Sequence, residues 1–169
     1  HTGGFGFVCL GIKAKPLKFC GPCTEDNATN NVAELSCFLE VGRYILQGPH
    51  AHKCHERTVE LFFDSTFALN SIIAKQRRSQ ISELNALQRE AWLLWEDIKT
   101  FTKIRVEHVY AHGGILPNEI ADRLADDGRN NIVLYEACST THDYGSPAAL
   151  EQINALPHDV NCCPKIWSR

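Results

Sequence analysis

Hydrophobic and polar positions follow two different spacings along the chain, and each change of spacing predicts a new element. Two short apolar runs, at 5–12 and 17–20, flank a stretch with Lys and Pro and are typical of two strands joined by a turn. From Asn31 the apolar residues recur every three or four positions until Gly48-Pro49, which predicts a helix with a strong stop signal. The polar stretch after it, at 50–56, is predicted to be a loop.

Helical and strand-like spacings continue as far as Asn130, after which they fade and no convincing element is predicted. The resulting order of hairpin, helix, strand, two helices, strand and helix predicts an α/β fold in which helices pack against a mixed sheet. The predicted elements of this part are a strand at 59–63, helices at 66–73 and 81–98, a strand at 104–112, and a helix from Pro117 to Gly128.

Length and composition indicate one globular domain with some excess chain. The 169 residues are 44% hydrophobic and 22% charged, which is typical of globular proteins and unlike disordered or fibrous ones. A formal net charge of −3 argues against a protein held to nucleic acid by bulk charge, although Lys75, Arg77 and Arg78 form a local basic cluster. No apolar run approaches the length of a membrane span and no signal pattern is present, so we expect an intracellular setting, in the cytoplasm or nucleus.

The eight cysteines and the first residue bear on redox state and origin. The cysteines lack the spacing of a disulfide framework and are expected to be reduced thiols. The CGPC stretch at 20–23 has the spacing of a zinc knuckle, with 50–56 and Cys162-Cys163 as further candidates, so a structural zinc site is a rival hypothesis. The chain contains no Met and begins at His1, from which we expect a fragment of a longer product.

Three acidic residues stand where the fold does not require a solvated carboxylate. Asp64 follows the predicted strand at 59–63, and Glu34 and Asp122 lie near the starts of two predicted helices. Functional groups gather at the carboxyl ends of strands in α/β sheets, and carboxylates from separate elements are suitable ligands for Mg²⁺ or Mn²⁺. Such ligands could hold two ions roughly 4 Å apart for displacement at phosphate. Each residue also has a structural interpretation, since acidic residues cap helices and complement the helix dipole.

Three motifs, in this order, resemble those of type 1 ribonuclease H. The stretch TNNVAEL (29–35) is similar to that family's Thr-Asn-Asn-x-x-Glu-Leu signature, and LFFDST (61–66) is similar to its strand that ends in Asp-Ser. The stretch YAHGGILPNEIADRLA resembles its closing block, with His112 ten residues before Asp122. Within that block, GGILPNEIADRLA is most similar to the ribonuclease H domains attached to reverse transcriptases of retroelements.

The resemblance implies a ribonuclease H-like mixed sheet and endonucleolytic hydrolysis of the RNA strand of RNA–DNA hybrids by two Mg²⁺ or Mn²⁺ ions. It also implies a monomer, fused to a reverse transcriptase in the full-length product. Glu34, Asp64 and Asp122 would be the metal ligands and catalytic residues, and His112 would assist proton transfer or product departure. Both asparagines of the first motif also suit a helix N-cap. Contacts to the hybrid are implied for Asn30, Asn31, Ser65, Asn118, Lys75, Arg77 and Arg78.

One residue of the family pattern has no counterpart in this chain. Family members carry a fourth acid, an Asp on a first strand that lies centrally in the sheet, whereas only His1 and Thr2 precede the glycine pair here. We therefore expect a ribonuclease H-like domain at 3–130 that lacks this strand, followed by a C-terminal extension of unknown role at 131–169. The missing Asp also supports an alternative, a catalytically dead domain that binds nucleic acid or has a structural role.

Overall fold

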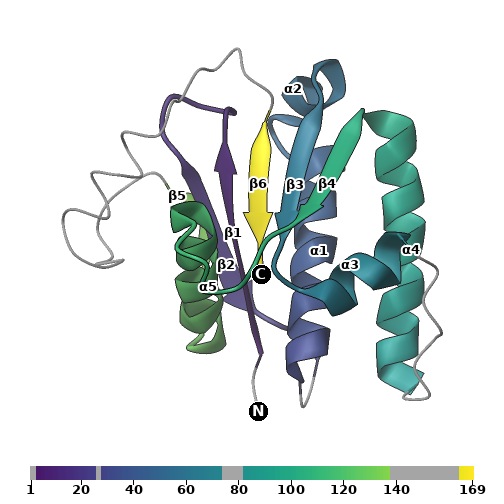
Figure 1. The fold of residues 1–169 in the computed structure, drawn as a ribbon, viewed down its shortest axis with the longest axis vertical. Helices are drawn as coiled ribbons and strands as arrows, with labels where there is room; N and C mark the ends of the chain where they lie inside the picture. Colours follow the sequence, from purple (N-terminus) through teal and green to yellow (C-terminus); the bar gives the residue numbers. More distant parts are fainter. Residues whose placement is uncertain (1–2, 26–27, 74–81, 138–163) are drawn as a thin grey trace.

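The computed structural model describes residues 3–25, 28–73, 82–137 and 164–169, which form one mixed sheet with helices on both faces (Figure 1). The predicted α/β fold is therefore confirmed. In the described ranges, no helix combines the length and the apolar character needed to cross a membrane. The basic cluster and three of the cysteines lie outside the described residues, namely Lys75, Arg77, Arg78, Cys138, Cys162 and Cys163.

Most of the predicted elements are confirmed to within a few residues. In chain order the elements are β1 (Gly4–Leu10), β2 (Leu17–Pro22), α1 (Asn30–Gln47), α2 (Ala51–Glu56), β3 (Val59–Phe63), α3 (Thr66–Ile73), α4 (Ser82–Phe101), β4 (Ile104–His108), α5 (Leu116–Arg129), β5 (Leu134–Ala137) and β6 (Lys165–Ser168). The strands lie in the order β4-β3-β6-β1-β2-β5. β3 pairs parallel with β4 and β6, and the other neighbouring strands pair antiparallel.

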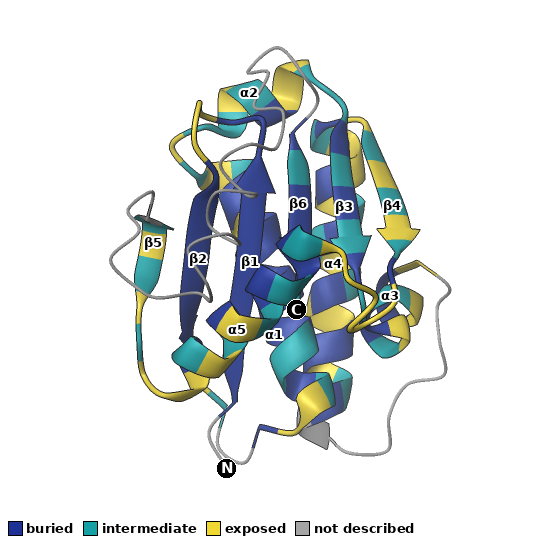
Figure 2. Cartoon of the chain, turned by 60° about the vertical axis from the view of Figure 1, so that its left-hand side comes forward, coloured by how far each residue is buried: buried dark blue, intermediate teal, exposed yellow. Residues whose placement is uncertain are grey.

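Each face of the sheet carries its own helices. α1, α3 and α4 lie on one face and α5 lies on the other (Figure 1). Successive side chains of a strand point to opposite faces, so Phe7 and Cys9 of β1 join the core with α1 whereas Val8 and Leu10 pack with α5. Figure 2 accordingly shows β1 and β2 as buried along nearly their whole length. Burial on both sides explains why β1 is a continuous apolar run in the sequence.

Glycines at alternate positions of β1 set how closely α5 approaches the sheet. A Cβ on Gly6 would lie 2.4 Å from the backbone nitrogen of Ala125, and a Cβ on Gly4 would lie 2.2 Å from the carbonyl oxygen of Ala125. Both positions therefore require glycine, which lets the α5 backbone lie directly on β1. Because α5 carries Asp122, the same contact brings that carboxylate against the sheet.

Two local predictions are wrong. Residues 50–56 contain helix α2 rather than a loop, because Cys54 is buried in the core and Lys53 donates a 2.7 Å hydrogen bond to the backbone after β1. One buried apolar residue in a short polar stretch gives no helical period to detect. Gly128 does not end α5, which continues to Arg129; it is instead buried where a Cβ would lie 2.3 Å from a carbonyl oxygen of β2.

The C-terminal segment supplies the strand between β1 and β3. The side chains of β6 alternate between the two cores, with Ile166 on the α1 side and Trp167 on the α5 side, where its ring stacks on Phe62. The gap expected at the central position of the sheet is therefore filled by a strand from the other end of the chain. β5 also comes from 131–169, so two strands that the sequence pattern misses belong to the same sheet as the predicted domain.

Candidate active site

Glu34 and Asp64 come together where α1 passes the carboxyl end of β3. Asp64 directly follows β3, as predicted, and Ser65 begins the turn into α3. The Ser65 hydroxyl donates a hydrogen bond to the Glu34 carboxylate and accepts one of 3.0 Å from the backbone N–H of Ala68. One buried serine therefore fixes both the start of α3 and the position of Glu34.

Asp64 is also connected to β4 and α5. The side-chain amide of Asn118 is 2% exposed and donates a 3.4 Å hydrogen bond to the Asp64 carboxylate. The Nε2 of His108, at the end of β4, lies 3.2 Å from the Asp64 carbonyl oxygen. The backbone and the carboxylate of Asp64 are therefore held by two different neighbours, one strand and one helix.

The Asp122 carboxylate faces the end of β6. It forms an ion pair with the guanidinium of Arg169. Arg169 follows Ser168, whose register partner is the last residue of β3, so Arg169 and Asp64 are the next residues of two adjacent parallel strands. Glu34, Asp122 and Arg169 line one pocket of about 540 Å³, together with residues of β1 and α5. Glu34 and Asp122 therefore share one pocket with Arg169, whereas Asp64 lies beside Glu34 at the end of β3 and does not line that pocket.

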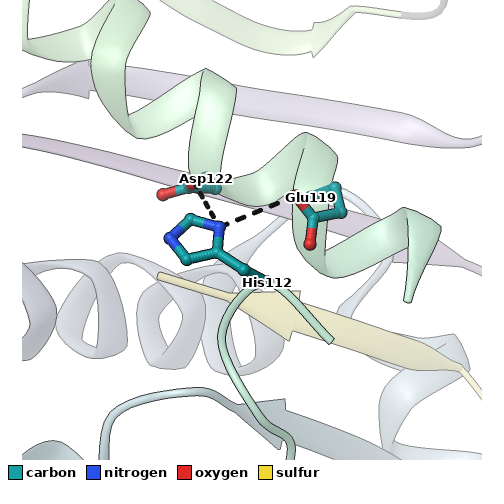
Figure 3. A group of neighbouring side chains, drawn as sticks. All are labelled: His112, Glu119 and Asp122. Atoms are coloured by element: carbon teal, nitrogen blue, oxygen red, sulfur yellow. Dashed lines mark ion pairs between the residues drawn. The ribbon is translucent and has the colours of Figure 1, made fainter. Parts of the chain in front are cut away.

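His112 approaches the same carboxylate from the loop before α5 (Figure 3). Its Nδ1 lies 3.8 Å from an oxygen of Asp122 and 3.8 Å from an oxygen of Glu119. The side chain of His112 is 71% exposed, so the imidazole is open to solvent. Sequence reasoning misses Glu119, although its i, i+3 spacing from Asp122 places both carboxylates on one face of α5.

The pocket concentrates negative charge in a partly buried place. Burial raises the pKa of Glu34, the hydrogen bond from Ser65 opposes that rise, and the charges of Asp64 and Arg169 act in opposite directions. Carboxylate oxygens are the donors that Mg²⁺ and Mn²⁺ prefer, so the chemistry of this donor set fits the ions that the sequence predicts.

The family of the chain follows from comparison with known proteins. A family model described as RNase H matches residues 1–130, which is more than half of the chain. The chain belongs to the RNase H family. No curated protein matches it. Membership of this family points in general to cleavage of RNA–DNA hybrids, and residues 1–130 include all three motifs on which the resemblance depends.

The two asparagines of the first motif lie at the start of α1 in this RNase H domain. Asn30 is exposed and lines the pocket beside Glu34, whereas Asn31 is half-buried. Neither asparagine caps the helix, because the hydroxyl of Thr29 accepts a 3.4 Å hydrogen bond from the backbone N–H of Val32. Capping therefore does not account for either asparagine, and Asn30 stays the better placed of the two for a ligand contact.

Two other residues expected to contact the hybrid are buried. Ser65 is 8% exposed and Asn118 is 2% exposed, and both donate hydrogen bonds to predicted metal ligands. The Oδ1 atom of Asn118 has no hydrogen-bond partner in the described part of the chain. Their contacts in the RNase H domain are those of residues that position Glu34 and Asp64, and direct contact with a hybrid stays a prediction.

The described cysteines of the RNase H domain do not support the zinc hypothesis. Cys20 and Cys23, the two cysteines of the CGPC stretch, pack against opposite cores, Cys20 with α5 and Cys23 with the core on the α1 side. Cys54 also lies in the core on the α1 side. Within 3–25, 28–73, 82–137 and 164–169, the group of three or more such side chains that lie close enough together to hold an ion is His112, Glu119 and Asp122, which contains no cysteine. Of the three predicted metal ligands, Asp122 belongs to this group, whereas Glu34 and Asp64 do not.

Proposed function

We propose that this RNase H domain hydrolyses the RNA strand of RNA–DNA hybrids with two divalent ions, Mg²⁺ or Mn²⁺, held by Glu34, Asp64 and Asp122. The observation that supports the proposal most directly is that α1 and α5 bring Glu34 and Asp122 to one pocket, with Asp64 next to Glu34 at the end of β3. Glu34 on α1 is bound by the serine that follows Asp64, and Asp122 on α5 is joined to them through Arg169. Carboxylates from three separate elements are the arrangement that a two-ion phosphate site requires.

Each proposed ligand has a neighbour that orients it. Ser65 donates to Glu34, Asn118 donates to Asp64, and the packing of α5 on β1 fixes Asp122. Buried hydrogen-bond donors of this kind hold a carboxylate in one direction and leave its remaining lone pairs for an ion. The chemistry that such ions supply when bound is activation of a water molecule and neutralisation of phosphate charge.

His112 is proposed to move a proton at the leaving group or to assist departure of the product. Its imidazole is exposed and lies 3.8 Å from Asp122, close enough to the carboxylates to reach a bound phosphodiester. Asn30, at the rim of the same pocket, is proposed to contact the minor groove of the hybrid, where a 2′-hydroxyl distinguishes RNA from DNA.

The test is cleavage of a labelled RNA–DNA hybrid in Mg²⁺ or Mn²⁺. Asp64→Asn removes the charge but keeps the shape, and it should lower the cleavage rate by at least about 100-fold. Asp97→Asn is the matched control, because Asp97 is exposed on α4 and does not line the pocket, and it should cleave like the wild type. Cleavage by Asp64→Asn at close to the wild-type rate would show that the site assignment is wrong.

One observation favours a second candidate, a catalytically dead RNase H domain that binds nucleic acid or has a structural role. Arg169 lies at the end of a central strand beside Asp64 and pairs with Asp122, so a positive side chain stands among the carboxylates. In this case the wild-type chain binds the hybrid without cleaving it in either ion. A gel-shift assay with the same hybrid, run beside the cleavage assay, distinguishes the two candidates.

We also infer that the domain serves the reverse transcriptase of a retroelement, as the resemblance of GGILPNEIADRLA suggests. As a separate chain it is expected to be a monomer, which light scattering coupled to size-exclusion chromatography would test.

A further inference from the structure

We propose that Arg169 is an intramolecular cation that competes with divalent metal ions for the carboxylates of the site. The guanidinium must release Asp122 before an ion gains full access to that ligand. This inference rests on the proposed function, because it takes Glu34, Asp64 and Asp122 as the metal ligands.

The sheet fixes the backbone of Arg169. The Arg169 N–H donates a 3.0 Å hydrogen bond to the Gly6 carbonyl oxygen, and the Gly6 N–H donates one of 3.3 Å to the Arg169 carbonyl oxygen. These two bonds continue the pairing of β6 with β1 by one residue, and Trp167 and Ser168 before it are buried. The side chain of Arg169 therefore starts from a defined point beside the end of β3.

The guanidinium acts on carboxylates from two helices. It forms an ion pair with Asp122 on α5, and its charge offsets a small part of the rise that burial causes in the pKa of Glu34 on α1. The side chains of Arg169 and Asp122 are 32% and 22% exposed, so water screens the pair only in part. Arg129 lines the same pocket but forms its ion pair with Asp126, one turn away on its own helix. Arg129 therefore carries the same charge at the same pocket from a position on α5, and it serves as a comparison for Arg169.

Competition follows from the chemistry of the two cations. An oxygen of Asp122 that is paired with a guanidinium is not free to coordinate Mg²⁺ or Mn²⁺. An arginine side chain keeps its proton in proteins, so it cannot give way by losing its charge and must move. β6 would thus stabilise the sheet and at the same time lower the affinity of the site for metal.

Isothermal titration of the full chain with Mn²⁺ alone tests this inference without any cleavage readout. Arg169→Gln should tighten Mn²⁺ binding by about five- to tenfold, because it removes a partly buried cation next to the ligands. Arg169→Lys keeps the charge and should stay within about twofold of the wild type. Arg129→Gln removes the same charge from the same pocket at a position whose ion pair is with Asp126, which is not a proposed ligand, and it should also change the affinity by less than about twofold.

Three results would contradict the proposal in distinguishable ways. If wild type and Arg169→Gln bind Mn²⁺ equally and Asp64→Asn does not bind it, Arg169 does not compete with the ion. That result would still agree with the proposed metal site. Equal tightening in Arg169→Gln and Arg129→Gln attributes the effect to net charge and also overturns the competition. Mn²⁺ binding that Asp64→Asn does not change contradicts the proposed function and this inference with it. Thermal melts in EDTA show whether each variant is folded. If Arg169→Gln does not fold, Arg169→Met is titrated instead, because methionine keeps an unbranched apolar side chain and removes the charge.

Discussion

Replacing Ile166 by alanine tests whether the C-terminal segment is part of the core. Ile166 is fully buried on β6 between β1 and β3, where its register partners are Cys9 and Leu61. The change removes the side-chain carbons beyond Cβ, worth about 0.8 kcal/mol for each buried methylene, and leaves a cavity between two strands that cannot easily close. Together these terms predict that the free energy of unfolding falls by about 3 kcal/mol, within the range measured for such changes.

Urea unfolding followed by circular dichroism would measure this loss, and a thermal melt should show a midpoint lower by about 6–12 °C for a chain of this size. The matched control is Ile73→Ala, since Ile73 is 51% exposed at the end of α3. The control should cost less than about 1 kcal/mol, because little apolar surface is lost and alanine favours the helix. If Ile166→Ala costs no more than the control, β6 does not occupy the centre of the sheet and the reasoning about Arg169 loses its basis.

Two further predictions concern the packing of α5 and the edge strand β5. Gly6→Ala should lower the free energy of unfolding by at least about 2 kcal/mol, because the new Cβ would meet the α5 backbone at 2.4 Å, and a loss below about 0.5 kcal/mol in urea unfolding would contradict that contact. Burial lowers the pKa of His50 from 6.5, and Glu136, whose carboxylate lies 3.1 Å from its Nε2, opposes this shift. Folding therefore favours the neutral imidazole, so the stability from this group is present above about pH 6.5 and is lost as the pH falls below it. Glu136→Gln should lower the pKa of His50 further in an NMR titration, and an unchanged pKa would show that the pair is not formed.

The sequence predicts the fold well wherever an element is long enough to show its own period. α1, α4 and α5 each run for several turns with one apolar face, and β3 is a run of apolar residues bounded by polar ones. β5 and β6 have only four residues each, and the partners of β6 lie at the other end of the chain, on β1, and on β3. Nothing local distinguishes such a strand from a loop, because its stability comes from strands that are distant in sequence.

In the candidate site, too, some residues could be predicted from local sequence and others could not. Glu34, Asp64 and Asp122 could be proposed from sequence because each follows a recognisable start of a helix or end of a strand, and the structure places them as expected along those elements. Glu119 could have been found from its helical spacing to Asp122. Arg169 could not, because its approach to the carboxylates depends on the register of β6 against β1 and β3. No local sequence pattern predicts a charged side chain whose position in the site depends on the pairing of strands that are distant in sequence.

The strand β6 completes the sheet between β1 and β3, and the end of the same segment brings a cation, not a carboxylate, to Asp122. The backbones of β1 and β3 need a hydrogen-bonding partner between them, and any strand with apolar residues facing both cores can serve, as Ile166 and Trp167 do. The site, in contrast, depends on which side chain follows that strand. Here the side chain is Arg169, whose charge is opposite to that of the fourth carboxylate, which the family pattern includes and this chain was expected to lack. Ile166→Ala should therefore lower stability with little effect on metal affinity, and Arg169→Gln should change metal affinity with little effect on stability. Packing depends on Ile166 within β6, whereas the charge belongs to Arg169, directly after the strand.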